Sequence, residues 1–430
     1  MKLEGAKVVV VGMARSGVAA VDLLREKGAI VRAVDQKPIE GIEVEPQSEA
    51  AFADADLIVL SPGVPADLAD LSEAKRRGVK VIGDLELASW FLKGEIIGIT
   101  GANGKTTTTA LTGHILKESG IAAQVGGNIG TPPASMVNTS RADQLNVLEL
   151  SSFQLETTET FRAHIGAALN ITPDHLDRHY TIENYAEAKG RLFLNQREGD
   201  FAVLNHDDAI TRAYADRTKG KPVWFSSTHE VSPGAFVDGP RIMLNSQFLM
   251  HASEVPLRGV HNLENTMAAA AIAQLAGATL PQIRAAVMTF PGVEHRLEFV
   301  RERNGVDWYN DSKATNVDAA LKAVAAFAGA LWIILGGKDK NSDYTPLAAP
   351  LKEKAHAALL IGAAADKIRA QLGGEVRMIA CRTLDTAVHE ANARAQRGDT
   401  VLLAPACASF DQFQNYEHRG REFKRLVEGL

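Results

Sequence analysis

The sequence predicts an α/β protein with three domains. Short runs of β-branched residues alternate with helical patterns along the whole chain, which is typical of parallel sheets covered by helices. A length of 430 residues suits two to four domains of about 150 residues each. We expect a Rossmann-like N-terminal domain at residues 1–93, a central domain with a mainly parallel sheet at 94–292, and a Rossmann-like α/β C-terminal domain at 293–430.

Each predicted domain alternates strands with helices. The first holds strands at Val8–Val11, Ile30–Val34 and Leu57–Leu60 and a helix near Val18–Lys27. The second holds strands at Ile96–Thr100, Val147–Leu150, Ala167–Asn170 and Phe201–Leu204, helices at Lys105–Ser119, Ile182–Asn195 and Leu263–Ala278, and, between Ser232 and Pro256, turn signals that predict antiparallel hairpins. The third holds strands near Trp332–Leu335, Ala358–Ile361 and Thr400–Leu403, with helices between them.

The composition argues against several protein classes. The net charge is -6, whereas a general nucleic-acid or anionic-membrane binder needs a basic surface. Two cysteines, Cys381 and Cys407, form no disulfide framework and fit a reducing compartment. The apolar stretch Ala319–Leu335 contains Lys322 and Gly329, so it predicts a helix, a break and a buried strand rather than a span of about 20 apolar residues. We expect a soluble, cytoplasmic protein with no nucleic-acid or membrane partner.

The strongest chemical signal is a strand, a glycine turn and a helix in the run Gly98-Ile99-Thr100-Gly101-Ala102-Asn103-Gly104-Lys105-Thr106-Thr107. Glycines let backbone amides approach phosphate oxygens, and a helix N-terminus favours negative charge. Lys105 is expected to reach the β- and γ-phosphates, and the Thr106 hydroxyl to hold Mg²⁺. The strict spacing requires glycine where Ile99 stands, so the loop is a variant. It predicts that the central domain is a P-loop ATPase domain.

A second glycine turn, Val11-Gly12-Met13-Ala14-Arg15-Ser16-Gly17, follows the first strand and opens a helix. Asp35 ends the next strand, where a Rossmann domain binds ribose. Taken alone, this pattern indicates an NAD-dependent dehydrogenase. The pyrophosphate of a UDP-sugar would fit the same turn, and simple packing of strand on helix would explain it too.

Polar residues follow two further predicted strands. Glu149 lies near the end of one, and Asp174 and His175 follow another. In open parallel sheets this edge faces the ligand crevice, and carboxylates suit a hard cation such as Mg²⁺. The alternatives are a helix-capping or ion-paired glutamate and a structural histidine. Lys189, in the next helix, is by its surroundings in sequence an ordinary solvated lysine.

Four motifs together resemble those of the Mur ligases. The loop Thr100–Thr107 is similar to the one that Mur ligases share with folylpolyglutamate synthases. The run Glu149-Leu150-Ser151-Ser152-Phe153-Gln154-Leu155-Glu156 resembles the D-glutamate-adding type, as does Asn310-Asp311-Ser312-Lys313-Ala314-Thr315-Asn316. Ala404–Phe413, continuing to Tyr416-Glu417-His418-Arg419-Gly420, is close to the C-terminal signature of the family. The resemblance covers nearly the whole chain, in order.

This resemblance implies a cytoplasmic, monomeric bacterial ligase that joins D-glutamate to UDP-N-acetylmuramoyl-L-alanine for peptidoglycan, using ATP, two Mg²⁺ ions and a CO₂-derived carbamate on Lys189. It implies catalytic roles for Lys105, His175, Lys189, Asp311 and Lys313, and magnesium ligands at Thr106, Glu149, His175 and carbamylated Lys189. ATP would contact Gly101, Ala102, Asn103, Gly104, Lys105, Thr106, Thr107, Asn262 and Arg296. The UDP substrate would contact Arg15, Ser16, Asp35, Lys37 and Asn128, and D-glutamate would contact Thr315, Lys340, Ser409 and Tyr416. Asp339 departs from the aspartate position of some relatives.

Other readings of the sequence remain open. A sister Mur ligase or a folylpolyglutamate synthase would share the phosphate loop but take another substrate. An ATP-binding module without catalysis would bind nucleotide and release no phosphate. An NAD-dependent dehydrogenase is favoured by the first glycine turn alone.

Overall fold

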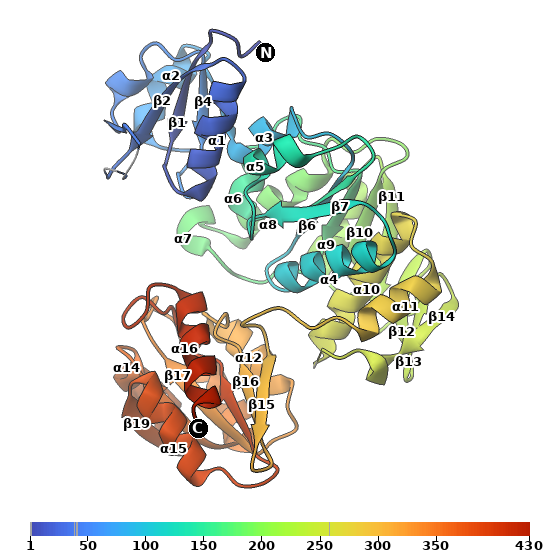
Figure 1. Cartoon of the computed structure of the whole chain (residues 1–430), viewed down its shortest axis with the longest axis vertical. Coiled ribbons are helices and arrows are strands. Elements are labelled where there is room, and N and C mark those ends of the chain that lie inside the picture. The colour runs from blue at the N-terminus through green and yellow to red at the C-terminus, as the bar shows by residue number, and fades with distance from the viewer. Residues whose placement is uncertain (1, 38, 40–41, 258) are drawn as a thin grey trace. The chain divides into compact units, whose positions relative to one another are not determined.

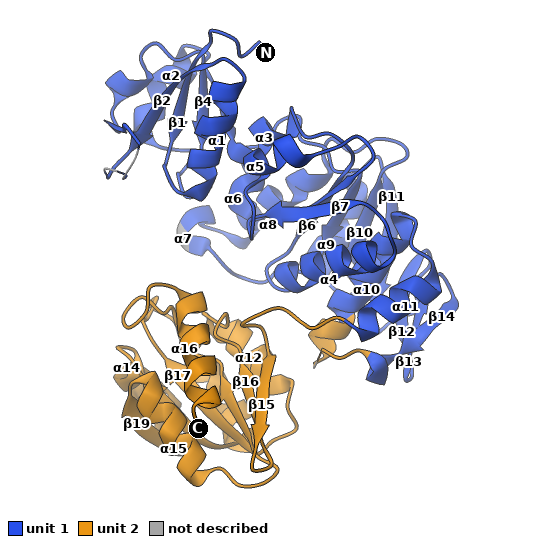
Figure 2. Ribbon diagram, viewed as in Figure 1, with its two compact units in different colours: residues 1–254, 264–289 blue, residues 255–263, 290–430 orange. Residues whose placement is uncertain are grey.

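The structure is a computed structural model that describes residues 2–37, 39, 42–257 and 259–430. The described chain contains three sheets flanked by helices (Figure 1). It divides into two compact units, one formed by residues 1–254 and 264–289 and the other by 255–263 and 290–430 (Figure 2). The predicted α/β class is confirmed. The predicted domain boundaries at 93/94 and 292/293 stay predictions; the first lies inside unit 1, and the second lies close to Phe290, where unit 2 resumes.

The first sheet is parallel throughout and has the strand order β3-β2-β1-β4-β5. Its strands are β1 (Lys7–Val11), β2 (Ile30–Asp35), β3 (Glu45–Pro46), β4 (Leu57–Leu60) and β5 (Lys80–Gly83), and its helices are α1 (Arg15–Glu26), α2 (Ser72–Arg76) and α3 (Asp84–Ser89). Val8–Val11 is buried on both faces of the sheet, between two apolar clusters, as a continuous valine run requires. The strand order reverses direction at β1, which places the loop after β1 at a switch point where ligands bind.

The second sheet has nine strands in the order β14-β13-β12-β11-β10-β9-β6-β8-β7. The strands are β6 (Ile96–Thr100), β7 (Ala123–Gly127), β8 (Leu145–Glu149), β9 (Ile165–Ala168), β10 (Phe201–Asn205), β11 (Lys221–Ser226), β12 (Gly234–Asp238), β13 (Arg241–Leu244) and β14 (Gln247–His251). Its helices are α4 (Lys105–Glu118), α5 (Pro133–Met136), α6 (Ser152–Leu155), α7 (Leu176–His179), α8 (Ile182–Gly190), α9 (Ala209–Ala213), α10 (Val260–Leu275) and α11 (Leu280–Met288). The predicted hairpins are confirmed, because β12, β13 and β14 pair antiparallel while β12 joins β11 parallel.

The third sheet has the order β15-β16-β20-β17-β18-β19 and is parallel except for the β15–β16 hairpin. Its strands are β15 (Glu298–Arg303), β16 (Val306–Asn310), β17 (Leu331–Gly336), β18 (Ala355–Ile361), β19 (Met378–Arg382) and β20 (Thr400–Leu403). Its helices are α12 (Val317–Ala325), α13 (Ala348–Lys354), α14 (Ala365–Leu372), α15 (Leu384–Arg394) and α16 (Tyr416–Glu428). Apolar clusters line both faces of the sheet. The stretch Ala319–Leu335 forms part of a helix and a buried strand, as predicted.

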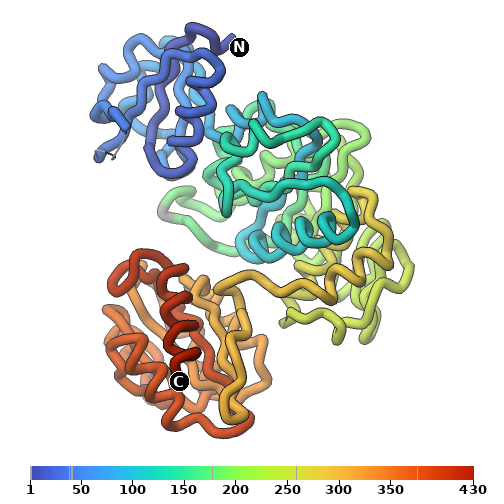
Figure 3. The backbone as a smooth tube through the Cα atoms, in the orientation of Figure 1, coloured from blue at the N-terminus to red at the C-terminus, as the bar shows by residue number. Residues whose placement is uncertain are grey.

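Two predicted elements have different bounds in the structure. The strand expected at Ala167–Asn170 is β9, which ends at Ala168, because Asn170 bonds to the phosphate loop instead of continuing the ladder. The helix expected at Ile182–Asn195 ends at Gly190 and continues as a short 3-10 turn. Among the described helices none is long and apolar enough to cross a membrane. Figure 3 traces the backbone from strand to helix in the same orientation.

Candidate active site

The phosphate loop joins β6 to α4 in unit 1. Gly101 has φ +154° and Gly104 has φ +85°, values that L side chains rarely adopt. A Cβ on Gly104 would lie 2.2 Å from the Oδ1 atom of Asn265. The loop therefore needs glycine at this position, and the bare backbone lets its amides approach a ligand oxygen.

Asn170, which follows β9, holds this loop. Its carbonyl oxygen accepts from the Ala102 amide at 2.8 Å, and its side-chain Oδ1 accepts from the Asn103 amide at 2.8 Å. Asn265 contributes from α10, accepting from the Thr108 hydroxyl at 3.3 Å. Sequence reasoning assigned no role to either asparagine. The available signal was Asn170 itself, a polar residue directly after a buried strand.

Lys105, the first residue of α4, lies over the loop. Its Nζ donates to the carbonyl oxygens of Gly101 at 2.8 Å and Ala102 at 2.9 Å. Thr106 and Thr107 follow, and each is 5% exposed. The structure therefore brings the predicted nucleotide residues of unit 1 into one turn, with an ammonium, two hydroxyls and several backbone amides.

Glu149 ends β8, the strand beside β6. It is 1% exposed, and its Oε1 accepts from the Asn128 Nδ2 at 3.0 Å. Its other oxygen, Oε2, is buried and has no hydrogen-bond partner among the described residues. An unpaired buried carboxylate oxygen is costly, and a hard divalent cation with oxygen ligands would satisfy it. The residues present therefore fit Mg²⁺.

Lys189 is buried, contrary to the solvated lysine that its sequence surroundings indicate. It is 1% exposed, and its Nζ donates to the Gly101 carbonyl at 2.9 Å and to the Thr100 Oγ1 at 3.3 Å. Burial, followed by the charge of Lys105, lowers the pKa of Lys189 well below its ordinary value. Glu149 and Asp174 oppose this shift only in part. Lys189 is buried because the last turn of α8 packs against the phosphate loop.

His175 lies at the start of α7 in the left-handed region, with φ 53°. Its side chain is 48% exposed and lies 3.7 Å from the Asp174 carboxylate. Its ring packs edge-on against Phe153 at 4.9 Å, and His179 stacks on the same phenyl ring at 5.5 Å. An imidazole beside a carboxylate is a group that can ligate a metal.

The N-terminal glycine turn is held closed by Asp35. Its two carboxylate oxygens accept from the Met13 amide at 2.6 Å and from the Lys37 amide at 3.1 Å. Arg15 donates to the Gly130 carbonyl, so the turn lies next to the loop that carries Asn128. The remaining predicted contacts differ in exposure: Ser16 is partly buried and Lys37 is exposed.

In unit 2, most of the predicted residues lie on loops that follow β16, β17 and β20; Tyr416 begins α16, Asn262 lies in α10 and Arg296 precedes β15. Asp311 follows β16 and is 5% exposed, and its Oδ1 accepts from the Leu297 amide at 3.2 Å. Burial raises the pKa of Asp311 to about 6, against the opposing charge of Arg296. Arg296 also lowers the pKa of His261, after burial and Lys322. Arg296 is therefore near Asp311 and near the first turn of helix α10, which contains Asn262.

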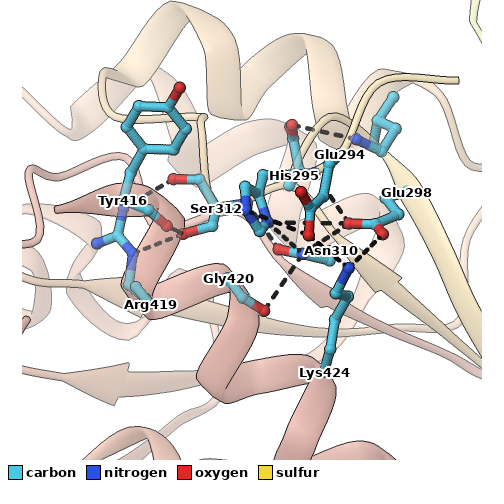
Figure 4. Close-up of polar contacts among 11 residues, drawn as sticks. Glu294, His295, Glu298, Asn310, Ser312, Tyr416, Arg419, Gly420 and Lys424 are labelled. Atoms are coloured by element: carbon cyan, nitrogen blue, oxygen red, sulfur yellow. Dashed lines mark hydrogen bonds and ion pairs between the residues drawn. The ribbon is translucent and has the colours of Figure 1, made fainter. Parts of the chain in front are cut away.

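A buried network fixes the turn at residues 310–313 (Figure 4). Arg419, fully buried on α16, donates to Ser312 Oγ at 2.9 Å, to the Ser312 carbonyl at 2.8 Å and to the Cys407 carbonyl at 3.1 Å. On the other side of the turn, Asn310 Nδ2 donates to His295 Nδ1 and to Glu298, each at 2.9 Å. Arg419 belongs to a motif of the sequence but received no role from it; a buried arginine that bonds carbonyls cannot be distinguished from an exposed one by sequence.

The remaining residues of unit 2 differ in exposure. Lys313 lies 5.4 Å from the centre of the Tyr416 ring, and Thr315 is two residues further along the same turn. Ser409 is 2% exposed, whereas Lys340 is exposed. The Lys338 amide donates to the Ala408 carbonyl at 2.8 Å, which joins the loop of Lys340 to the loop of Ser409.

Asp339 makes internal contacts. It accepts from the Tyr344 hydroxyl at 2.9 Å and from the Lys367 ammonium at 2.8 Å. Tyr344 also contacts the buried Cys407 thiol at 2.9 Å. Burial raises the pKa of Cys407 to about 11, in agreement with a packed residue rather than a nucleophile.

Three family models match the chain in order. They are the MurD-like N-terminal domain of Mur ligases at residues 6–83, the Mur ligase middle domain at 99–273, and the Mur ligase glutamate ligase domain at 295–407. Solved structures agree in fold. The UDP-N-acetylmuramate-alanine ligase of Thermotoga maritima matches with a TM-score of 0.62 at 19% identity over 99% of both chains. The MurF ligase of Thermotoga maritima in complex with ADP matches with a TM-score of 0.62 at 16% identity, over 100% of this chain and 96% of that one.

Curated relatives match over nearly their full length. The UDP-N-acetylmuramoylalanine--D-glutamate ligase of Solibacter usitatus is 59% identical over 100% of this chain and 99% of its own. The protein of the same name from Koribacter versatilis is 50% identical over 99% and 98%. With relatives at this identity and three family models along its length, the chain belongs to the Mur ligase family.

Proposed function

We propose that this chain is an ATP-dependent ligase that adds D-glutamate to UDP-N-acetylmuramoyl-L-alanine in the synthesis of peptidoglycan precursors, and that it acts as a cytoplasmic monomer. The names of the relatives at 59% and 50% identity support the substrates. The observation that carries the chemistry is the pair of lysines on the phosphate loop. Lys105 and Lys189 both donate to the Gly101 carbonyl, and the unpaired carboxylate oxygen of Glu149 lies on the adjacent strand.

A carboxylate and an amine do not condense spontaneously in water, so the alanine carboxylate of the substrate must be activated. It attacks the γ-phosphate of ATP, which releases ADP and leaves an acyl phosphate. The amine of D-glutamate then attacks the acyl carbon, and phosphate leaves. In the first step the loop amides and Lys105 hold the phosphates and neutralise the charge that develops on them. Lys105 exchanges its loop carbonyls for phosphate oxygens when ATP enters.

Members of this family use ATP and Mg²⁺. Magnesium supplies charge neutralisation at the phosphates. Glu149 and the Thr106 hydroxyl are suited to hold one ion, and His175 is suited to a second. Burial lowers the pKa of Lys189 and so favours its neutral amine, and a neutral amine adds to CO₂, giving a carbamate and one proton. The carbamate would replace a cation beside the metal by an anionic oxygen ligand.

The domain boundaries at 93/94 and 292/293 fit this division of labour: a substrate domain, an ATPase domain and an amino-acid domain. D-glutamate carries two carboxylates, so its pocket needs cations and hydroxyls. Lys340, Ser409 and Thr315 supply these groups on adjoining loops, and Tyr416 lies beside Lys313. Asp311 and Lys313 act on the phosphates together with Arg296, and Asn262 contacts the base.

The decisive measurement is the release of phosphate from ATP by the full chain, supplied with UDP-N-acetylmuramoyl-L-alanine and either enantiomer of glutamate. We expect release with the D-enantiomer only, and only when both substrates are present. A sister ligase would respond to another amino acid, and a folylpolyglutamate synthase to a folate. Equal release with L-glutamate, or none with both partners present, would refute the proposal.

The carbamate has a separate test. Replacing Lys189 with alanine is expected to lower turnover about a hundredfold, because a metal ligand is lost, and added short-chain carboxylates should restore part of the activity. Incubation with ¹³C-bicarbonate should give one carbamate resonance in the wild-type protein and none in the variant. A resonance that persists in Lys189→Ala would assign the adduct to another lysine.

A further inference from the structure

Two histidines and an aspartate meet at the carboxyl ends of β10 and β11, outside the site described above. His206 and Asp207 follow β10 directly, and His229 lies three residues after the end of β11. One ring nitrogen of each histidine and one carboxylate oxygen of Asp207 lie within 4.8 Å of one another. None of the three belongs to the phosphate loop or to the residues assigned to magnesium.

The carboxylate of Asp207 is oriented and ionised. Burial opposes its ionisation, but hydrogen bonds from Ser226 and Thr228 outweigh burial and lower the pKa of Asp207 below its ordinary value. The Ser226 Oγ donates at 2.6 Å and the Thr228 Oγ1 at 2.7 Å, both to Oδ1. The same oxygen is hydrogen-bonded to the Nδ1 atom of His229 at 3.1 Å, a contact that an ion bound between the two atoms would replace. Two atoms at this separation are spaced as neighbouring ligands of one small ion, which lie about 3.3 Å apart in a tetrahedral zinc site with bonds of about 2.0 Å.

The imidazole ring of His206 is not used in a hydrogen bond among the described residues. Its Nδ1 atom is buried and has no hydrogen-bond partner in the described part of the chain. The ring packs edge-on against Trp224 at 5.7 Å and against His229 at 5.3 Å, so it is held facing the second imidazole. A buried imidazole nitrogen without a partner is costly. Hydrogen bonding within the described chain therefore does not explain why a histidine stands here.

We propose that His206, Asp207 and His229 bind a borderline divalent metal ion of the zinc type. Two imidazoles and one carboxylate favour zinc, cobalt or nickel over magnesium, which prefers oxygen ligands. The side chain of His229 is 61% exposed, so its ring can rotate by the small amount that closes the site. A solvent-open cavity of about 740 Å³ borders His206, Trp224 and Glu230; it gives the ion a path, and a water a place as fourth ligand.

The position is also informative. β10 and β11 are neighbouring parallel strands of the sheet that carries the phosphate loop, and their carboxyl ends share one edge. Ser227, between the two groups of ligands, donates a hydrogen bond from its hydroxyl to the Glu264 carboxylate of α10 at 3.1 Å. An ion at this site would tie the ends of β10 and β11 together, and its removal is expected to lower stability rather than to abolish turnover.

The test uses the full chain with saturating Mg²⁺, so that the oxygen sites are occupied, and titrates Co²⁺ while visible absorption is recorded; Zn²⁺ then displaces the cobalt. We expect one ion per chain with the absorption of a site that contains nitrogen ligands. His206→Gln and His229→Gln should each weaken binding at least tenfold, because the loss of a mere outer-shell partner of a metal ligand already costs about that much.

A matched control is His389→Gln. His389 is 62% exposed and lies 3.6 Å from Asp385 on α15, so it reproduces an exposed histidine–aspartate pair without the third ligand; its variant should bind as the wild type does. Unchanged binding in folded His206→Gln, judged by circular dichroism, or weakened binding in His389→Gln, would overturn the proposal. It does not depend on the ligase activity, so phosphate release and cobalt absorption fail independently.

Discussion

The phosphate-loop region of unit 1 and the loop region of unit 2 hold their charged groups in different ways. In unit 1 the charges themselves are buried: Lys189 and Glu149 are each 1% exposed, and one oxygen of the Glu149 carboxylate has no hydrogen-bond partner among the residues that the structure describes. In unit 2 Lys313 and Lys340 are partly or fully exposed, while beneath the first of them Ser312 and Arg419 are buried and bonded to each other. Burial without pairing changes protonation, whereas a bonded network fixes position. We therefore expect burial in unit 1 to change the reactivity of its charged groups, and the hydrogen-bonded network in unit 2 to position the side chains next to it. Asp311 is the exception in unit 2, since it is buried with a raised pKa.

The largest effect is expected where unit 1 supplies charge directly. Lys105→Ala should lower turnover several hundredfold, about 3 to 4 kcal/mol in the barrier, because a cation at the developing charge is lost. The fold should remain intact, as the Lys105 ammonium donates to carbonyl oxygens of its own loop. Phosphate release measures the effect, and Lys117→Ala, an exposed lysine later in α4, serves as the control. Normal turnover in Lys105→Ala would show that this cation of unit 1 does not act on the developing charge.

The exception in unit 2 predicts a pH-dependent stability. Because the pKa of Asp311 is raised to about 6 in the folded protein, its neutral form favours folding below the unfolded pKa, and this stability is lost as the pH rises through about 6. Asparagine stays neutral at every pH, so Asp311→Asn does not lose this stability. Above pH 6 its free energy of unfolding should exceed that of the wild type by up to about 3 kcal/mol.

The gain should shrink toward zero near pH 4, and urea unfolding at a series of pH values measures it. Asp84, whose pKa burial also raises to about 6 in unit 1, provides the parallel variant Asp84→Asn in the other region. A gain in Asp311→Asn that is the same at pH 4 and pH 8 would contradict the assigned cause.

The positioning role of unit 2 is tested at Arg419. Arg419→Lys leaves buried carbonyl acceptors without donors, so the free energy of unfolding should fall by about 2 to 3 kcal/mol. The KM for D-glutamate and the KM for ATP should both rise, because the network holds the turn of Ser312, between Asp311 and Lys313, and the loop of Cys407. Arg421→Lys, exposed on the same helix, should change neither. A variant as stable as the wild type with the same KM would show that the network places nothing.

The smallest effect is expected at the exposed side of unit 2. Lys340→Ala should raise the KM for D-glutamate about tenfold, which is roughly 1.4 kcal/mol, through one lost contact with a carboxylate. Turnover at saturation and thermal stability should be unchanged, since Lys340 is exposed. Lys338→Ala, two residues away in the same loop and also exposed, is the matched control. Equal effects of the two variants would show that the loop acts by general charge.

Local sequence patterns predicted much of the fold. The wrong predictions arose where a residue bonds to a partner that is distant in the chain. The three alternating blocks predicted the α/β class, and the glycine positions around Lys105 predicted a turn between β6 and α4. The end of β9 was misplaced by two residues because Asn170 bonds to Asn103, 67 positions away. Within the site, the contiguous loop was predicted as a unit, whereas Asn170 and Asn265 were missed because their partners are distant in the chain.

The sequence by itself determined the order of strands and helices, the glycine loop that a phosphate fits, and the family, because each of these is written in residues close together or in motifs read in order. Only the tertiary structure decided which charges are buried. Lys189 is 89 positions from Thr100, and Arg419 is 107 positions from Ser312; their desolvation depends on those distant neighbours. A side chain's pKa and its freedom to move are set by what surrounds it in space, and no local pattern specifies that.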